Sequence, residues 1–146
     1  MSQLTYRPAL ESDLNFLLDL RTKTMNPHLI ASSLSTAVDS HMLRIKYKFE
    51  HASIIEYNRT SIGLLKIERK QDGIELIQIQ IDPLYQGKGI GKKILEQIIN
   101  EANSDKKSIT LQVLKVNKAQ RLYVKLGFKI IEESNDSYFM KYSNDI

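Results

Sequence analysis

Hydrophobic residues recur along the chain with two spacings, one typical of helices and the other typical of strands. The strongest helical spacing follows Gly89, where apolar residues form one stripe of a 3.6-residue repeat: Ile90, Ile94, Leu95, Ile98, Ile99 and Ala102. The clearest strand covers 74–81, because isoleucines there alternate with glutamines up to Asp82-Pro83. One short segment therefore joins the two most strongly predicted elements.

Weaker patterns predict the remaining elements. We expect helices at 11–25, within 33–49 and at 117–126, and we expect the first to be broken by Asn26-Pro27 after a stripe of Leu14, Leu17, Leu18 and Arg21. We expect strands at 4–7, 52–56, 62–68, 109–114, 128–132 and 137–142. This order predicts an α/β (α+β) domain with about four helices on a mixed, mostly antiparallel sheet of six to seven strands. The chain has no repeat or linker-like stretch, so we expect one domain over 1–146.

Composition excludes several classes of protein. The 42% hydrophobic and 26% charged content is typical of a chain with a packed core. There is no cysteine, which excludes disulfides, zinc–thiolate sites and cysteine nucleophiles. His28, His41 and His51 are scattered, so we expect no metal site. No apolar run has signal-peptide or membrane-spanning character, and we expect a cytoplasmic protein without membrane association.

Charge is concentrated in one stretch of the chain. Residues 86–129 carry ten basic side chains against three acidic ones, although the net charge of the whole chain is only +4. Such a stretch is compatible with a solvated lysine face. It is equally compatible with a polyanion site, for nucleic acid or for a cofactor with several phosphates.

The basic stretch begins with a glycine-rich segment, YQGKGIGKK. The Walker pattern fails there, because three residues rather than four separate Gly87 from Gly91 and Lys93 replaces Ser/Thr. The dinucleotide fingerprint lacks its third glycine, which is replaced by Lys92. The pattern Gln/Arg-x-x-Gly-x-Gly/Ala, between a strand and a helix, is matched completely by 86–91.

This segment, in the context IQIDPLYQGKGIGKKIL, resembles the GNAT superfamily of GCN5-related N-acetyltransferases. NKAQRLYVKLGF resembles the second common segment of that family, and the two occur in order at the expected separation. The resemblance implies the GNAT fold and direct transfer of acetyl from acetyl-CoA to a primary amine in a ternary complex. Physically, glycines at a helix N-terminus let unpaired N–H groups approach a diphosphate closely.

The resemblance also implies which residues act. Coenzyme contacts would come from Ile79, Gln80, Ile81, Gln86, Gly87, Lys88, Gly89, Ile90, Gly91, Lys92, Asn117 and Tyr123. Tyr123 would be the general acid for the departing thiolate, and Glu75 the general base for the amine. The alternatives are that Tyr123 packs in the core, that Asn117 caps a helix and that Glu75 is a surface residue. Strict alternation would place Glu75 on the face of Ile77 to Ile81, whereas the family's bulge near 80–82 would change that parity.

The acceptor is left open by the pattern. Met25 and His28 lie where relatives build part of the acceptor pocket, and a small-molecule or peptide amine is expected. Gln112 stands where acetyltransferases of ribosomal-protein N-termini carry a glutamate base, which argues against that specialised function. The resemblance is compatible with a homodimer. A non-catalytic coenzyme A sensor is the alternative function, and we expect no nucleic-acid partner because aromatic residues do not interleave the lysines.

Overall fold

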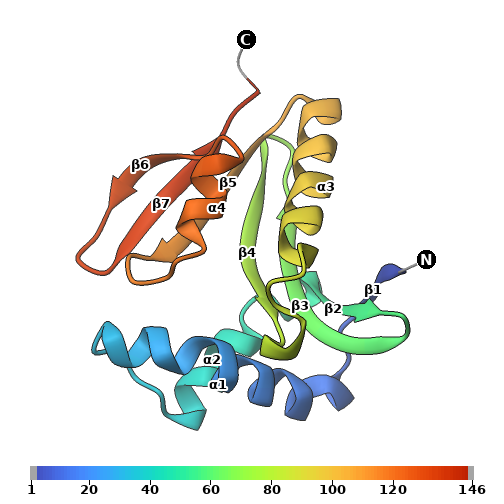
Figure 1. The fold of residues 1–146 in the computed structure, drawn as a ribbon, viewed down its shortest axis with the longest axis vertical. Coiled ribbons are helices and arrows are strands. Elements are labelled where there is room, and N and C mark those ends of the chain that lie inside the picture. Colours follow the sequence, from blue (N-terminus) through green and yellow to red (C-terminus); the bar gives the residue numbers. More distant parts are fainter. Residues whose placement is uncertain (1–2, 145–146) are drawn as a thin grey trace. The chain divides into compact units, whose positions relative to one another are not determined.

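The computed structural model describes residues 3–144, in which seven strands and four α-helices are found (Figure 1). The strands are β1 (Leu4–Pro8), β2 (Ala52–Tyr57), β3 (Thr60–Arg69), β4 (Gly73–Ile81), β5 (Ser108–Leu114), β6 (Lys129–Glu133) and β7 (Ser137–Tyr142). The helices are α1 (Leu14–Ala31), α2 (Val38–Lys46), α3 (Ile90–Asp105) and α4 (Gln120–Lys125). The strands form one mixed sheet in the order β1-β2-β3-β4-β5-β7-β6. The expected fold class is confirmed.

The chain divides into two compact units that share this sheet. The first contains the residues up to Ile67 together with Gln78–Lys88, and the second contains Glu68–Ile77 together with the residues from Gly89 onward. β4 and the segment after it therefore contribute residues to both units. That residues 1–146 behave as one domain stays a prediction.

The expectation that Asn26-Pro27 breaks the first helix is wrong. α1 continues through Pro27 to Ala31. Proline removes one backbone hydrogen bond, but the turn after it places Leu29 in the core, where only 7% of the residue is exposed. The helix ends instead at Ala31, and Ser33 beyond it adopts the left-handed conformation with φ +56°, while the Leu34 N–H donates to the Leu29 carbonyl at 2.8 Å.

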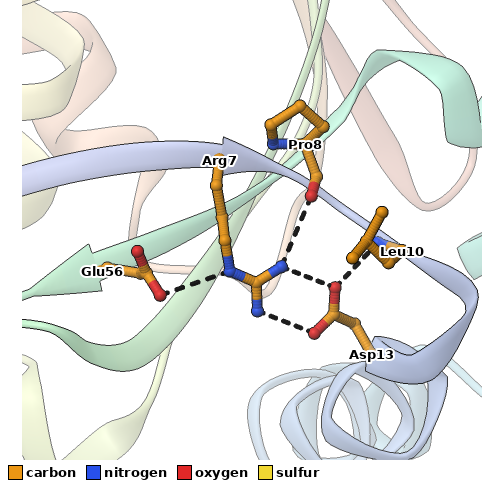
Figure 2. A network of polar contacts seen from close by, with 5 residues as sticks. All are labelled: Arg7, Pro8, Leu10, Asp13 and Glu56. Atoms are coloured by element: carbon orange, nitrogen blue, oxygen red, sulfur yellow. Dashed lines mark hydrogen bonds and ion pairs between the residues drawn. The ribbon is translucent and has the colours of Figure 1, made fainter.

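A polar network fixes the start of α1 in the first unit (Figure 2). The Arg7 guanidinium donates two hydrogen bonds of 2.8 Å to the Asp13 carboxylate and one of 3.3 Å from Nε to Glu56. Asp13 Oδ2 also accepts from the Leu10 N–H at 2.7 Å. The bonds from Arg7 lower the pKa of Asp13, so its stabilising contribution is present at neutral pH and is lost as the pH falls below about 4. The network joins β1, β2 and the entry to the first helix.

The second unit packs α3 on its strands. The predicted stripe is buried at Ile90, Ile94, Leu95, Ile98 and Ala102, and Ile99 is half-buried. β5 pairs with β7 in antiparallel register from Ile109–Tyr142 to Leu114–Ser137. β4 pairs with β5 in parallel over four positions, from Gly73–Ser108 to Leu76–Leu111. The Tyr142 hydroxyl donates to Asn103 Oδ1 at 2.9 Å and so connects β7 to α3.

Gly63 allows close contact between two backbones within the first unit. A Cβ at this position would overlap the Gln80 carbonyl oxygen and would lie 3.2 Å from Ile55 Cδ1. We therefore expect Gly63→Ala to lower the free energy of unfolding by about 2 kcal/mol, measured by chemical denaturation. Gly91→Ala is the matched control, because a Cβ there meets no atom within 4 Å. Equal stability of the two variants would contradict the close approach.

Candidate functional site

The glycine-rich loop is shaped by its own side chains before α3 begins. Asp82 Oδ1 accepts from the Leu84 N–H at 2.9 Å and starts a short turn at Pro83. The Gln86 Nε2 donates to the Ile81 carbonyl at 2.8 Å. The Gln86 side chain, expected at the coenzyme, is therefore used within the described chain to close the loop.

Gly87 and Gly89 adopt left-handed backbone conformations, with φ of +75° and +79°. Most other residues resist these angles, and the missing side chains leave open space, since a Cβ at either position would meet no atom within 4 Å. The loop can therefore bring its backbone against a ligand without an intervening side chain.

Six consecutive backbone N–H groups, from Gly87 to Lys92, make no hydrogen bond to the described residues. Before them, the Gln86 N–H donates to Pro83 at 3.3 Å, and after them the Lys93 N–H donates to Gly89 at 3.0 Å. The first turn of α3 has no acidic residue and contains Lys92. A cation there is disfavoured by the helix dipole, typically by 0.3–1 kcal/mol. This arrangement is suited to an anion. An anion would accept hydrogen bonds from the N–H groups and would offset the positive charge of the helix N-terminus and of Lys92.

The strand before the loop alternates between buried and half-buried residues without a break. Ile74, Leu76, Gln78 and Gln80 are buried, whereas Ile77, Ile79 and Ile81 are half-buried. Glu75 thus shares the strand face of the three isoleucines, as strict alternation predicts, and burial parity does not change up to Ile81. The buried glutamines are the unexpected feature, because Oε1 of Gln78 and Oε1 of Gln80 have no hydrogen-bond partner in the part of the chain that the structure describes.

Tyr123 lies on α4 in the second unit and is 6% exposed. Its ring packs on Phe128 with centroids 5.7 Å apart. Burial raises the pKa of its phenol to about 12. Within residues 3–144 its hydroxyl makes no hydrogen bond, although buried tyrosines normally have a partner for this group.

Asn117 precedes α4 and is half-buried. Its Oδ1 accepts from the Ala119 N–H at 2.9 Å, as in a capping interaction, and its side-chain NH₂ donates to no described residue. The capping role and a ligand contact are therefore compatible, because they use different atoms.

Glu75 forms an ion pair with Lys70 at 3.2 Å, across the turn between β3 and β4. Gln112 is exposed on β5, opposite Phe139 of β7. Met25 and His28 are half-buried on α1.

Several residues that the sequence did not single out as functional are buried in the first unit. Arg21 on α1 is 7% exposed and His41 on α2 is 2% exposed. Lys66 on β3 is fully buried and donates to the carbonyls of Arg44, Ile45 and Tyr47 at 2.9, 3.0 and 2.6 Å, so that it caps the C-terminal end of α2. The sequence contains one signal for this group, because Arg21 is a charged residue on an otherwise apolar helical stripe.

The model of the family described as "Acetyltransferase (GNAT) domain" matches residues 48–130, more than half of the chain. The chain belongs to the GNAT acetyltransferase family. It is accordingly classed with the acyltransferases, as the two sequence segments indicated. No curated protein matches the chain.

Solved structures share the GNAT fold at low sequence identity. The PaiA N-acetyltransferase of Thermoplasma acidophilum, in complex with coenzyme A, is 18% identical with a TM-score of 0.73 over 97% of this chain and 99% of that chain. The ribosomal-protein-S18-alanine N-acetyltransferase of Escherichia coli is 18% identical with a TM-score of 0.69 over 99% and 96%. Arabidopsis thaliana Naa50, in complex with the bisubstrate analogue CoA-Ac-MVNAL, is 20% identical with a TM-score of 0.66 over 96% and 98%.

Between residues 3 and 144, no helix is long and apolar enough to cross a membrane. Over the same range, no group of three or more histidine, aspartate and glutamate side chains is arranged to hold a metal ion.

Proposed function

We propose that the protein moves an acetyl group from acetyl-CoA to the primary amine of a small molecule or peptide, by direct transfer in a ternary complex. The observation that carries the proposal is the run of six N–H groups, Gly87 to Lys92, that make no hydrogen bond within residues 3–144, at a helix start that bears lysine instead of acid. The coenzyme A complex of PaiA and the CoA–peptide analogue bound to Naa50 support this choice of co-substrate.

The loop holds the diphosphate of the coenzyme in this proposal. Its N–H groups donate to the phosphate oxygens, and the lysines of the loop supply positive charge. Ile79, Gln80 and Ile81 lie along the pantetheine arm, which also takes a hydrogen bond from the free NH₂ of Asn117. Gln86 contributes to the coenzyme site as part of this loop, which its side chain closes through the Ile81 carbonyl.

The transfer requires a neutral amine as the nucleophile and stabilisation of the coenzyme sulfur as the leaving group. An ordinary alkylamine has a pKa of about 10.4, so roughly one molecule in 10³ is neutral at pH 7. Glu75 accepts the proton, directly or through water, after its carboxylate separates from Lys70. The backbone N–H of Ile81 donates to the carbonyl oxygen as negative charge develops there. As the amine nitrogen bonds to the acetyl carbon, the carbon–sulfur bond breaks. Tyr123, whose hydroxyl has no hydrogen-bond partner within residues 3–144, donates its proton to the departing sulfur.

Transfer is tested by following thiol release from acetyl-CoA with a library of amines. We expect release that depends on both the amine and the enzyme, and a rise in melting temperature with acetyl-CoA but none with duplex DNA. Stabilisation by acetyl-CoA without thiol release from any amine would instead support the coenzyme A sensor. Stabilisation by DNA that falls steeply with salt would contradict both functions.

A further inference from the structure

Arg21 is a buried arginine that forms no ion pair with any residue between 3 and 144. It lies on α1 beside Leu17 and Leu20, which are each 1% exposed, and is itself 7% exposed. Arginine is rarely buried to this extent unless it is paired, because removing its charge from water is costly. Burial is the main cause, and Arg44 the second, of the lowering of its pKa to about 10. An anion bound to this side chain would offset that cost.

The only hydrogen-bond partner of Arg21 among the described residues is a neutral one. Arg21 Nε donates to His41 Nδ1 at 2.9 Å, and His41 Nε2 lies 2.8 Å from Asn26 Oδ1. A ring whose Nδ1 accepts carries its proton on Nε2 and is uncharged. Burial and the charge of Arg21 lower the pKa of His41, which keeps it so. His41 is thus a positioning residue that holds Nε and leaves the two terminal nitrogens, with four N–H groups, unused.

The neighbouring charges have the same sign. Burial is the main cause that lowers the pKa of Lys66 to about 8. The positive charges of Arg44 and Arg21 lower it further. The Arg44 guanidinium lies over the Tyr47 ring at 5.2 Å. Within the described chain, Arg21, Arg44 and Lys66 form no ion pair with a carboxylate. The exposed Glu50 is the one acidic group that raises the pKa of Lys66, and its effect is the smallest of those acting there.

The same unit contains unpaired acceptors. The side-chain oxygens of Gln78 and Gln80 are buried without a hydrogen-bond donor, and these residues are 8% and 6% exposed. Gln78 Nε2 reaches the Arg44 carbonyl only weakly, at 3.4 Å. A buried polar atom without a partner costs about 1–3 kcal/mol, so two of them in one unit indicate a ligand with N–H donors.

We infer that the acceptor amine carries a carboxylate or phosphate group and that Arg21 binds this anion through its two terminal nitrogens, with Arg44 adding positive charge. A guanidinium matches either anion with two parallel hydrogen bonds, which a lysine cannot do. The oxygens of Gln78 and Gln80 accept from the N–H groups of the same molecule. This inference rests on the proposed function and narrows its substrate class from amines in general to amines with an acidic group.

Matched pairs of amines test the inference by thiol release. One pair is an α-amino acid and its carboxamide, and the other is phosphoethanolamine and ethanolamine. We expect kcat/KM for the anionic member of at least one pair to exceed that of its neutral partner by at least tenfold. The pair that responds identifies the anion as carboxylate or phosphate. Arg21→Gln should reduce this ratio to about one, and Arg44→Gln should reduce it severalfold.

Lys46→Gln is the control, because Lys46 is an exposed cation on the same helix as Arg44. It should leave the ratio unchanged. If Arg21→Gln does not fold, the wild-type ratios and Arg44→Gln still decide the question. Thiol release from neutral and anionic amines at equal kcat/KM would overturn the inference and leave the proposed function intact. No release from any amine would overturn both.

Discussion

Replacing Gly89 by glutamate will weaken acetyl-CoA binding by about 10³-fold or more. The residue has φ +79° and precedes the first turn of α3, where backbone N–H groups are unused. A carboxylate here would occupy those groups itself and repel the phosphates, and loss of several charge-assisted hydrogen bonds costs about 1.5–3 kcal/mol each. Isothermal titration calorimetry with acetyl-CoA measures the dissociation constant.

Two further substitutions at Gly89 separate charge from crowding. Gly89→Gln has nearly the same volume without the charge, and Gly89→Ala retains only the backbone strain of a left-handed residue, about 1 kcal/mol. We expect affinity to fall in the order Ala, Gln, Glu. Since a Cβ at this position meets no atom within 4 Å, all three should fold. Normal affinity of the glutamate variant would show that the loop does not hold the phosphates.

Tyr123→Phe will lower turnover by about 10²-fold with little change in the affinity for acetyl-CoA. The substitution keeps the packing against Phe128 and removes only a hydroxyl that has no partner among the described residues. Losing a positioned proton donor typically costs 10²–10⁴-fold in rate. Steady-state kinetics of thiol release and calorimetry measure the two quantities.

Tyr142→Phe is the matched control. Tyr142 also packs on Phe128, with centroids 5.7 Å apart, but its hydroxyl is already used by Asn103. Its loss should lower stability without lowering kcat. Equal turnover of Tyr123→Phe and the wild type would remove the catalytic role of Tyr123.

The raised pKa of Tyr123 has a pH consequence. With a folded value of about 12 against about 10 unfolded, the phenol remains protonated in the native protein to well above pH 10. Between these values the unfolded state has lost the proton that the folded state keeps, so the contribution of Tyr123 to stability falls as pH rises from about 10 to 12. We therefore expect the activity of the wild type and that of Tyr123→Phe to depend on pH in the same way near pH 10. The wild type should show no decrease there that the variant lacks. Such a decrease would mean that the phenol has its ordinary pKa.

Much of the fold could be predicted from periodicity, because α3 buries the stripe that its spacing indicates and the expected strands form the sheet. The break at Pro27 was wrong because one lost hydrogen bond is offset by burial of Leu29, which depends on tertiary packing. The sequence did not predict that Gln78 and Gln80 are buried while Ile77, Ile79 and Ile81 are only half-buried. Strand alternation identifies two faces, but it does not say which face is more buried.

The loop could be located from spacing alone, since glycines that need positive φ and lysines at a helix start are both visible in the sequence. The hydrogen bonds that the Gln86 and Asn117 side chains make could not be predicted, because their partners depend on how the turns close. Arg21 was visible as a charged residue on an apolar stripe. Its missing counter-ion appears only when α2 brings His41, a neutral residue, to its side.

A crystal structure of the protein with acetyl-CoA tests the central claim most directly. The account predicts diphosphate oxygens within about 2.7–3.2 Å of backbone nitrogens between Gly87 and Lys92. A coenzyme whose diphosphate is held elsewhere, or only by side chains while these nitrogens stay unbonded, would contradict it.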